Sequence, residues 1–259
     1  MCIKIVISSK LSLMKSLLIL LMVTLLFSCS KDSDGTLNAS ANGSGKGGSL
    51  ARFTIVENNL YLVDDASLKI FNISDPANAE LRNTIYLRFG VETIFPYKDK
   101  LFIGSSDGMY IYSIANPDAP LLLGEARHTR SCDPVVANDN TAFITLRGNQ
   151  PCGPAEDGLY IYSITNILSP KLINKQLIPT PHGLGLQDSV LYVCQKNNGM
   201  SIYNVTNPSN PVLRKKVTDK VFEDVICYGN ILICYVSTGL ALYDISEATI
   251  PVLLSEVNN

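Results

Sequence analysis

The sequence has no tryptophan, and only 8% of its 259 residues are aromatic. Tryptophan rings often form the platforms of carbohydrate-binding surfaces, so a platform of that kind is disfavoured. The only histidines are His128 and His182, and no Ser-His-Asp arrangement can be read from the sequence. HExxH, CxxC and EF-hand spacings are also missing, and no cofactor-binding loop is visible. We therefore expect no cofactor and no metal site of a known motif.

Positive charge is sparse as well. The formal net charge is −2. The lysines at positions 4, 10 and 15 lie within residues 1–28, a predicted signal peptide, and without them the chain has 18 basic against 23 acidic side chains. The only basic cluster is Arg214–Lys216. Because nucleic acids and anionic lipid surfaces attract clustered positive charge, we expect no nucleic-acid partner.

Long hydrophobic runs are missing except at the N-terminus. Lys15 precedes eleven residues, Leu17–Phe27, that are apolar apart from Thr24. This run is too short to span a bilayer but suits a secretory leader, so residues 1–28 are predicted to be a signal peptide, with Met14 as an alternative start. The sequence Leu26-Phe-Ser-Cys29 resembles a bacterial lipobox, in which Cys29 would be lipidated. A plain signal peptide with an incidental Cys29 is the alternative.

The segment after Cys29 has the composition of a tether. Ser30–Asp34 resembles the short export signal of bacterial surface lipoproteins, and Gly35–Ser49 is rich in Gly, Ser and Asn. Such a composition cannot bury a core, so residues 29–50 are predicted to form a flexible tether. We expect an exported outer-membrane lipoprotein, held at the membrane by its N-terminal lipid and with the cell surface as one destination.

One phrase occurs five times in the remaining chain. Its equivalent positions are 41, 50, 41 and 40 residues apart, at Asn72, Ser113, Ser163, Asn204 and Asp244. Strand-like repeats with a period near 40 are typical of β-propeller blades. Residues 51–259 are therefore predicted to be an all-β, five-bladed β-propeller of four-stranded antiparallel blades.

The second repeat illustrates one blade. Strands are expected at Val91–Tyr97, Leu101–Gly104, Met109–Ile114 and Leu121–Glu125, separated by turns and a proline-containing break. Both faces of the third strand are apolar or aromatic, so neighbouring blades must cover them. The recurring aromatic residue could form a ligand-stacking ring, but its regular place in mid-strand favours packing between blades; it is found at Phe71, Tyr112, Tyr162, Tyr203 and Tyr243.

The repeats resemble the LVIVD-repeat family of bacterial propeller proteins, over roughly residues 51–257. The third-strand phrase here reads Tyr-Ile-Tyr-Ser-Ile or Leu-Tyr-Asp-Ile, followed by Ser/Thr-Asp/Asn-Pro. Only Asp244 keeps the aspartate of the family phrase. The resemblance implies an exported, often lipid-anchored propeller, and it implies no catalytic residues.

All five blades are contiguous in sequence, and no strand is left over to complete a shared blade. We therefore expect the ring to close by blade-on-blade packing alone. The junction between blades 1 and 5 is then predicted to be the weakest seam.

Polar residues recur nine positions before the second strand of repeats 2 to 5, where the innermost strand begins at one mouth of the channel. Repeat 1 has only Ala51, or the nearby Arg52, at this place. They could hold a polar ligand or a cation, or simply line a hydrated mouth. These candidates for ligand binding are Glu92, Asp133, His182 and Glu223, with Asp224 beside the last.

Blade 3 carries a long turn, Gly148–Asp157, that the other blades lack. A disulfide between Cys132 and Cys152 is predicted to pin this turn, with a stabilisation of about 3 kcal/mol in the chain-entropy model. The remaining cysteines, Cys194, Cys227 and Cys234, are predicted to be small core residues. Basic residues near the turn could recognise a carboxylate or sulfate on a glycan, or form internal ion pairs; they are Arg127, His128, Arg130 and Arg147.

Three functions remain open from the sequence. The leading hypothesis is a non-catalytic envelope module that binds an unknown protein or glycan ligand. The alternatives are a glycan-directed enzyme that uses the carboxylates at the channel mouth, and a pure interaction scaffold.

Overall fold

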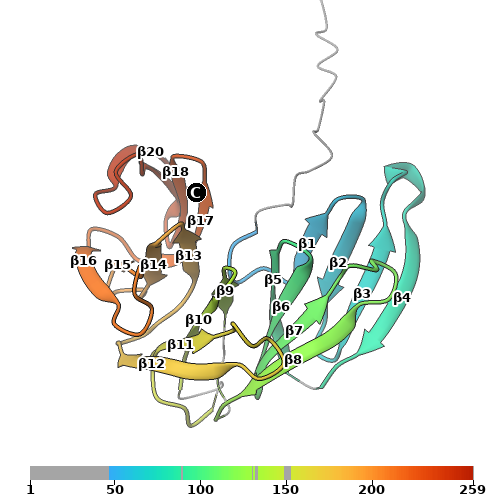
Figure 1. Ribbon diagram of the computed structural model, residues 1–259. Coiled ribbons are helices and arrows are strands. Elements are labelled where there is room, and N and C mark those ends of the chain that lie inside the picture. Colours follow the sequence, from blue (N-terminus) through green and yellow to red (C-terminus); the bar gives the residue numbers. More distant parts are fainter. Residues whose placement is uncertain (1–46, 89, 130, 132–133, 149–152, 259) are drawn as a thin grey trace, which may run out of the picture. The chain divides into compact units, whose positions relative to one another are not determined.

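The computed structural model describes residues 47–258, apart from residues 89, 130, 132–133 and 149–152. The predicted leader, Cys29 and most of the predicted tether lie outside the described residues. Within the part of the chain that the structure describes, no helix has the length and apolar character of a membrane span. Twenty strands form five four-stranded antiparallel sheets (Figure 1), and the one described helix is a 3-10 turn, η2 (Pro76–Asn78).

Each sheet is one blade of four consecutive strands, so the predicted five-bladed β-propeller is confirmed. Blade 1 contains β1 (Phe53–Val56), β2 (Asn59–Val63), β3 (Ser67–Asn72) and β4 (Glu80–Tyr86); blade 2 contains β5 (Val91–Tyr97), β6 (Lys100–Ser105), β7 (Gly108–Ser113) and β8 (Leu121–Arg127). Blade 3 contains β9 (Val135–Ala137), β10 (Thr141–Leu146), β11 (Gly158–Ser163) and β12 (Lys171–Leu177). Blade 4 contains β13 (Leu184–Gln187), β14 (Val190–Cys194), β15 (Met200–Asn204) and β16 (Val212–Val217); blade 5 contains β17 (Phe222–Tyr228), β18 (Ile231–Val236), β19 (Gly239–Asp244) and β20 (Val252–Asn258).

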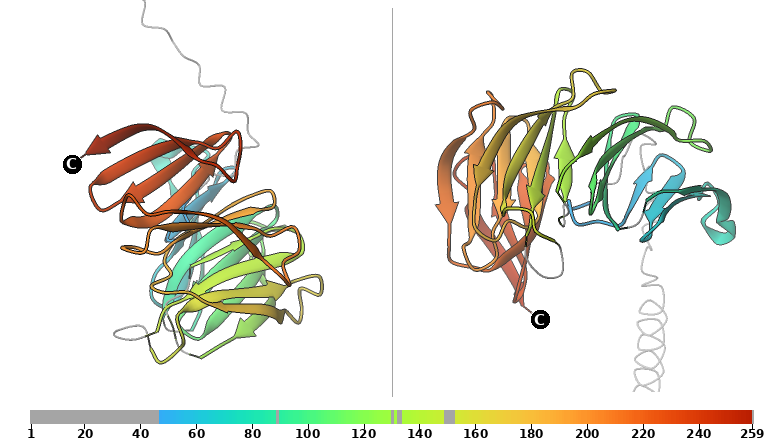
Figure 2. Two further views of the ribbon diagram at one scale, coloured as in Figure 1. Left: turned by 90° about the vertical axis from the view of Figure 1, so that its left-hand side faces the viewer. Right: turned by 90° about the horizontal axis from the view of Figure 1, so that it is seen from below.

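The first strand of every blade is the innermost strand. In Figures 1 and 2, β1, β5, β9, β13 and β17 lie toward the centre, and the fourth strands lie at the periphery. Contacts join β1 to β5, β5 to β9, β9 to β13 and β13 to β17. The starts of these innermost strands therefore meet at one mouth of the channel.

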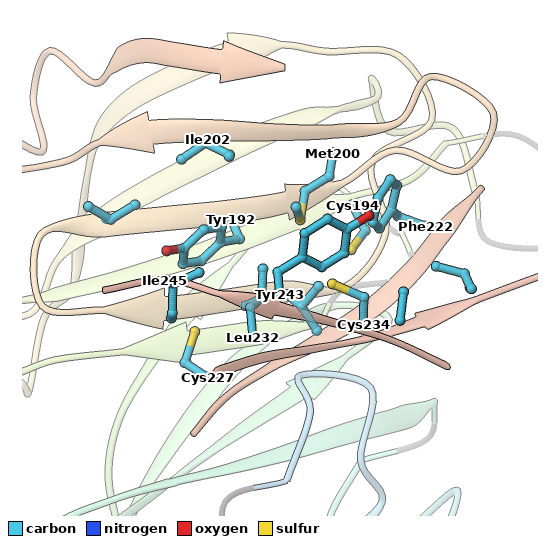
Figure 3. Close-up of a cluster of buried hydrophobic side chains, with 14 residues drawn as sticks. Tyr192, Cys194, Met200, Ile202, Phe222, Cys227, Leu232, Cys234, Tyr243 and Ile245 are labelled. Atoms are coloured by element: carbon cyan, nitrogen blue, oxygen red, sulfur yellow. The ribbon is translucent and has the colours of Figure 1, made fainter. Parts of the chain in front are cut away.

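The core lies between the blades rather than within them. Four clusters of buried hydrophobic side chains span the four junctions from blade 1 to blade 5. Figure 3 shows the cluster between blades 4 and 5, where the ring centroids of Phe222 and Tyr243 are 6.3 Å apart. The recurring third-strand aromatics are part of these clusters in blades 2 to 5, which confirms packing rather than ligand stacking. Cys194, Cys227 and Cys234 are buried core residues, as predicted.

The repeated phrase also fixes the turn after each third strand. Asn72 Oδ1 accepts a hydrogen bond from Ser74 N at 3.0 Å, and Asp244 Oδ1 accepts one from Ser246 N at 2.7 Å. Any short side chain with an acceptor oxygen can make this bond. Ser113 Oγ accepts the equivalent bond from Ala115 N at 3.3 Å, and Asn204 Oδ1 accepts it from Thr206 N at 3.1 Å.

Closure of the ring by blade packing alone was predicted, and this prediction is wrong. Ser49, within the predicted tether, is only 1% exposed, and its Oγ lies 3.1 Å from Asp224 Oδ1 of blade 5. Leu184 N of blade 4 donates to the same Oγ at 2.6 Å. This contact could not be predicted from the sequence, because a glycine- and serine-rich segment carries no apolar pattern. Among the described residues, no buried hydrophobic cluster spans blades 5 and 1.

Candidate functional site

Three of the predicted channel-mouth positions, Glu92, His182 and Glu223, are structurally equivalent, because strand pairing and backbone hydrogen bonds place them at the same register. Glu92 and Glu223 are each the extra residue of a β-bulge, since pairing passes from Val91 to Thr93 and from Phe222 to Asp224. A bulge turns a side chain out of the regular alternation, and bulges are frequent beside functional sites. His182 occupies the matching position in blade 4, where its backbone N–H donates to the Cys194 carbonyl oxygen at 2.8 Å.

His182 is the centre of a polar cluster at this mouth. Its Nε2 lies 2.9 Å from Arg147 Nη1, and its Nδ1 lies 3.0 Å from the Glu223 carbonyl oxygen. Burial, together with the positive charge of Arg147, lowers the pKa of His182. A neutral imidazole fits both contacts: Nδ1–H donates to the carbonyl, and Nε2 accepts from the guanidinium.

The Glu223 carboxylate adds a charged partner to this cluster. Its Oε2 lies 3.5 Å from His182 Nδ1 and 3.6 Å from Lys196 Nζ. Three blades therefore contribute, with Arg147 following β10, His182 preceding β13 and Glu223 in β17. Thr145 strengthens the junction, because its Oγ1 donates to the His182 carbonyl at 2.5 Å.

Asp224 does not face the same cluster. It accepts hydrogen bonds from Ser49 Oγ and from Leu50 N, the latter at 3.2 Å. Burial raises its pKa to about 6. Gly48 and Gly183 are required beside it, since a Cβ at either position would lie 2.1 Å from an Asp224 carboxylate oxygen. Asp224 thus holds the N-terminal segment.

The other predicted site residues are dispersed. Glu92 is half-buried in β5 of blade 2. Arg127 lies in the outermost strand β8, where it pairs with Glu125 at 3.0 Å and Asp107 at 3.1 Å. His128 Nδ1 lies 2.8 Å from the Thr129 carbonyl. Of the predicted basic group, only Arg147 joins the His182 cluster in the described structure.

Four predicted residues lie outside the described residues: Arg130, Cys132, Asp133 and Cys152. The disulfide therefore stays a prediction. The described neighbours do come together, because Ser131 Oγ donates to the Arg147 carbonyl at 2.7 Å. The two ends of the long turn are joined directly, because Asp157 Oδ1 accepts a hydrogen bond from Gly148 N at 2.8 Å.

The central channel contains a cavity of about 510 Å³, and His182, Arg147 and Glu223 are not among the residues that line it. Its walls come from β5, β9, β13 and β17, and Gly47 of the N-terminal segment also lines it. The middle is apolar, with Phe95, Val136, Leu186 and Ile226 among its lining residues. Lys98, Asn138, Gln187 and Asp188 also line it, at and beside the ends of the same strands. These residues were not among the predicted site residues, and the signal that could have identified them is the alternation along each innermost strand.

No metal centre is found among the described side chains, because no three His, Cys, Asp or Glu residues among them are grouped suitably.

A match to the nucleophile motif of serine hydrolases has a structural explanation. Gly104–Gly108 fits Gly-x-Ser-x-Gly by its letters, but these residues form the β6–β7 hairpin instead of a strand-to-helix elbow.

A model of the LVIVD repeat matches residues 47–85 and 188–219. The chain carries LVIVD repeats. Together with the five blades, this match confirms the resemblance that was drawn from the third-strand phrase. A search of curated proteins found no match.

The LVIVD-repeat chain is also similar in fold to solved structures. A protein from Lactobacillus plantarum is 12% identical, with a TM-score of 0.61 over 79% of this chain and 69% of that one. The computationally designed Ika8 protein is 13% identical, with a TM-score of 0.57 over 78% and 59%. A luciferin-regenerating enzyme is 14% identical, with a TM-score of 0.52 over 85% and 78%. The chain spans about three fifths of the designed protein's length.

Proposed function

We propose that this protein is a non-catalytic binding module whose central channel takes a small, largely apolar ligand. The observation that carries the proposal is the cavity of about 510 Å³ with an apolar middle. Ligand sites typically measure about 300–1,000 Å³ and combine apolar walls with a few polar groups. Here the polar side chains that line the cavity are those of Lys98, Asn138, Gln187 and Asp188.

The contacts of the His182 cluster favour a binding function over a catalytic one. Both ring nitrogens of His182 are engaged, by Arg147 and by the Glu223 carbonyl. A general base needs a nitrogen that can reach a substrate proton. A glycan-directed enzyme would need two carboxylates facing the substrate, whereas Asp224 is occupied by Ser49 and Leu50. A pure interaction scaffold is the remaining alternative.

The missing tryptophan makes ligand binding easy to measure. Tyr97 lines the channel, so Tyr97→Trp introduces the only tryptophan of the chain at the cavity wall. Titration with decanoate and with anilinonaphthalene sulfonate, as aliphatic and aromatic probes, is expected to change its emission saturably. Tyr86→Trp, at an 85% exposed position on β4, is the control and is expected not to respond.

A second variant separates the channel from nonspecific adsorption. Leu186→Gln, in the Tyr97→Trp background, places an amide in the apolar wall and should weaken probe binding several-fold. A non-saturating response of equal size at positions 97 and 86 would contradict the proposal.

We also propose that Cys29 carries a lipid that holds the module at the outer membrane. The leader and the lipobox-like sequence support this. Cells fed radiolabelled palmitate are expected to label the wild-type protein and not Cys29→Ser, which should leave the membrane fraction. Equal labelling of both proteins would count against the anchor.

A further inference from the structure

Strand pairing makes the exposure of equivalent residues directly comparable between blades. On the innermost strands, Phe53 of blade 1 is 59% exposed. The residues at its position in the other four blades are at most 1% exposed; they are Ile94, Val135, Leu184 and Val225. Each of these four packs against the preceding blade, whereas no blade among the described residues covers this face of blade 1. One face of blade 1 is therefore an uncovered copy of an internal packing face.

Blade 5 has an uncovered face as well, on the side that packs against the following blade at the internal junctions. Leu240 of β19 is 41% exposed, whereas the equivalent Leu68, Met109, Leu159 and Met200 are fully buried at 0%. Tyr235 of β18, which pairs with Leu240, is 54% exposed. Its equivalents Val63, Thr145 and Cys194 are at most 2% exposed. Blade 5 thus presents the face that covers the next blade at every internal junction.

The N-terminal segment lies between these two faces at the channel mouth. A Cβ on Gly48 would meet Asp224 of β17, whereas one on Gly47 would meet Ala51, just before β1. Ser49 is buried there and bonded to blades 4 and 5. Residues 47–50 therefore act as a wedge, and β17 makes no contact with β1 comparable to those between the other innermost strands.

We propose that the uncovered face of blade 5 packs against the uncovered face of blade 1 in a second copy of this chain. The four internal junctions show what covers such faces: a blade of the same repeat. Leu240, Tyr235 and Ile233 of one copy would meet Phe53, Leu62 and Phe71 of the other. The contact joins two different patches, so it is heterologous and can close into a dimer with two such junctions.

Lys69 is compatible with this junction. It occupies a third-strand position that Tyr110 and Tyr160 fill in blades 2 and 3. Its ammonium lies 2.8 Å from Asp64 at the turn, much as the Tyr110 hydroxyl lies 2.8 Å from Asp107. The charge therefore lies at the turn, and the aliphatic stem of Lys69 can pack against the second copy.

Sedimentation velocity over a concentration series tests the proposal, with the full chain carrying Cys29→Ser so that no lipid is attached. This protein is expected to self-associate, and Leu240→Glu and Phe53→Glu are each expected to be monomeric. Leu172→Glu, at a 49% exposed position on the outermost strand β12, is the control and should associate like the parent. A parent protein that stays monomeric throughout, or association that neither variant weakens, would overturn the proposal.

Mixing the two variants identifies which faces meet. A Leu240→Glu chain keeps an intact blade 1 face, and a Phe53→Glu chain keeps an intact blade 5 face. An equimolar mixture is therefore expected to form a one-to-one complex that neither variant forms alone. If the two folded variants, checked by circular dichroism, fail to associate on mixing, the head-to-tail contact is refuted.

Discussion

At the scale of single residues, Asp224 is the group whose ionisation should affect stability most clearly. Burial raises its pKa to about 6 from the ordinary value of 3.8. The folded state then holds the proton more tightly than the unfolded state, so stability falls as pH rises between these two values. A shift of this size corresponds to about 3 kcal/mol.

Asp224→Asn removes this titration and tests the sign. We expect the free energy of unfolding of the wild type, measured in urea, to fall relative to that of the variant by up to about 3 kcal/mol between pH 4 and pH 7. Both proteins share all other titrating groups, so the difference isolates Asp224. Parallel stability curves over this range would show that its pKa is not raised.

His182 offers a second prediction at the same scale. The positive charge of Arg147, 2.9 Å from Nε2, helps to lower the pKa of the imidazole. Arg147→Gln keeps a hydrogen-bond donor but removes the charge, so the pKa of His182 should rise. A pH titration of the histidine ring signals by NMR measures it, with His128→Gln used for assignment. Arg127→Gln, in the outermost strand, should leave the pKa of His182 unchanged.

At the scale of strands, the repeat predicted the elements well because each blade has the same needs. The strand predicted at Val91–Tyr97 is β5, and the one at Met109–Ile114 differs from β7 by one residue at each end. The bulges at Glu92 and Glu223 could not be predicted, since a bulge depends on pairing across two strands. The register of the channel mouth nevertheless followed from counting back along the repeats.

The seam between blades 1 and 5 gives a prediction about β1 and β18. Their outward faces carry Phe53 and Tyr235, which no neighbouring blade covers in the part of the chain that the structure describes. Hydrogen exchange at low protein concentration, below any self-association, should therefore show faster amide exchange in β1 and β18 than in β6 and β10. Equal protection across all five blades would contradict a weak seam.

At the scale of the whole molecule, the number of blades could be predicted from the sequence, but the way in which the chain holds them together could not. The period of about 40 residues is encoded redundantly, so five imperfect copies suffice to identify it. The wedge at residues 47–50 occurs once, and its role rests on two serine contacts and the absence of side chains at Gly47 and Gly48. The apolar channel likewise arises only when four innermost strands are brought together.

The wedge leads to the last prediction. Ser49→Ala removes the acceptor of the Leu184 N–H and one donor to Asp224, in a place where Ser49 is only 1% exposed. Loss of partners for buried polar groups costs about 1–3 kcal/mol, so the free energy of unfolding should fall by that amount. Ser255→Ala, on the exposed strand β20, is the control and should change stability by less than about 0.5 kcal/mol.

A double-mutant cycle in urea then asks whether Ser49 acts through Asp224. Because both side chains belong to one hydrogen-bonded unit, the effects of Ser49→Ala and Asp224→Asn should not add, with a coupling energy of about 0.5–3 kcal/mol. Strict additivity would mean that Ser49 stabilises the propeller without Asp224. The contribution of Ser49 would then come from its contact with Leu184 N of blade 4, and Leu50 N would be the group that joins the N-terminal segment to Asp224 of blade 5.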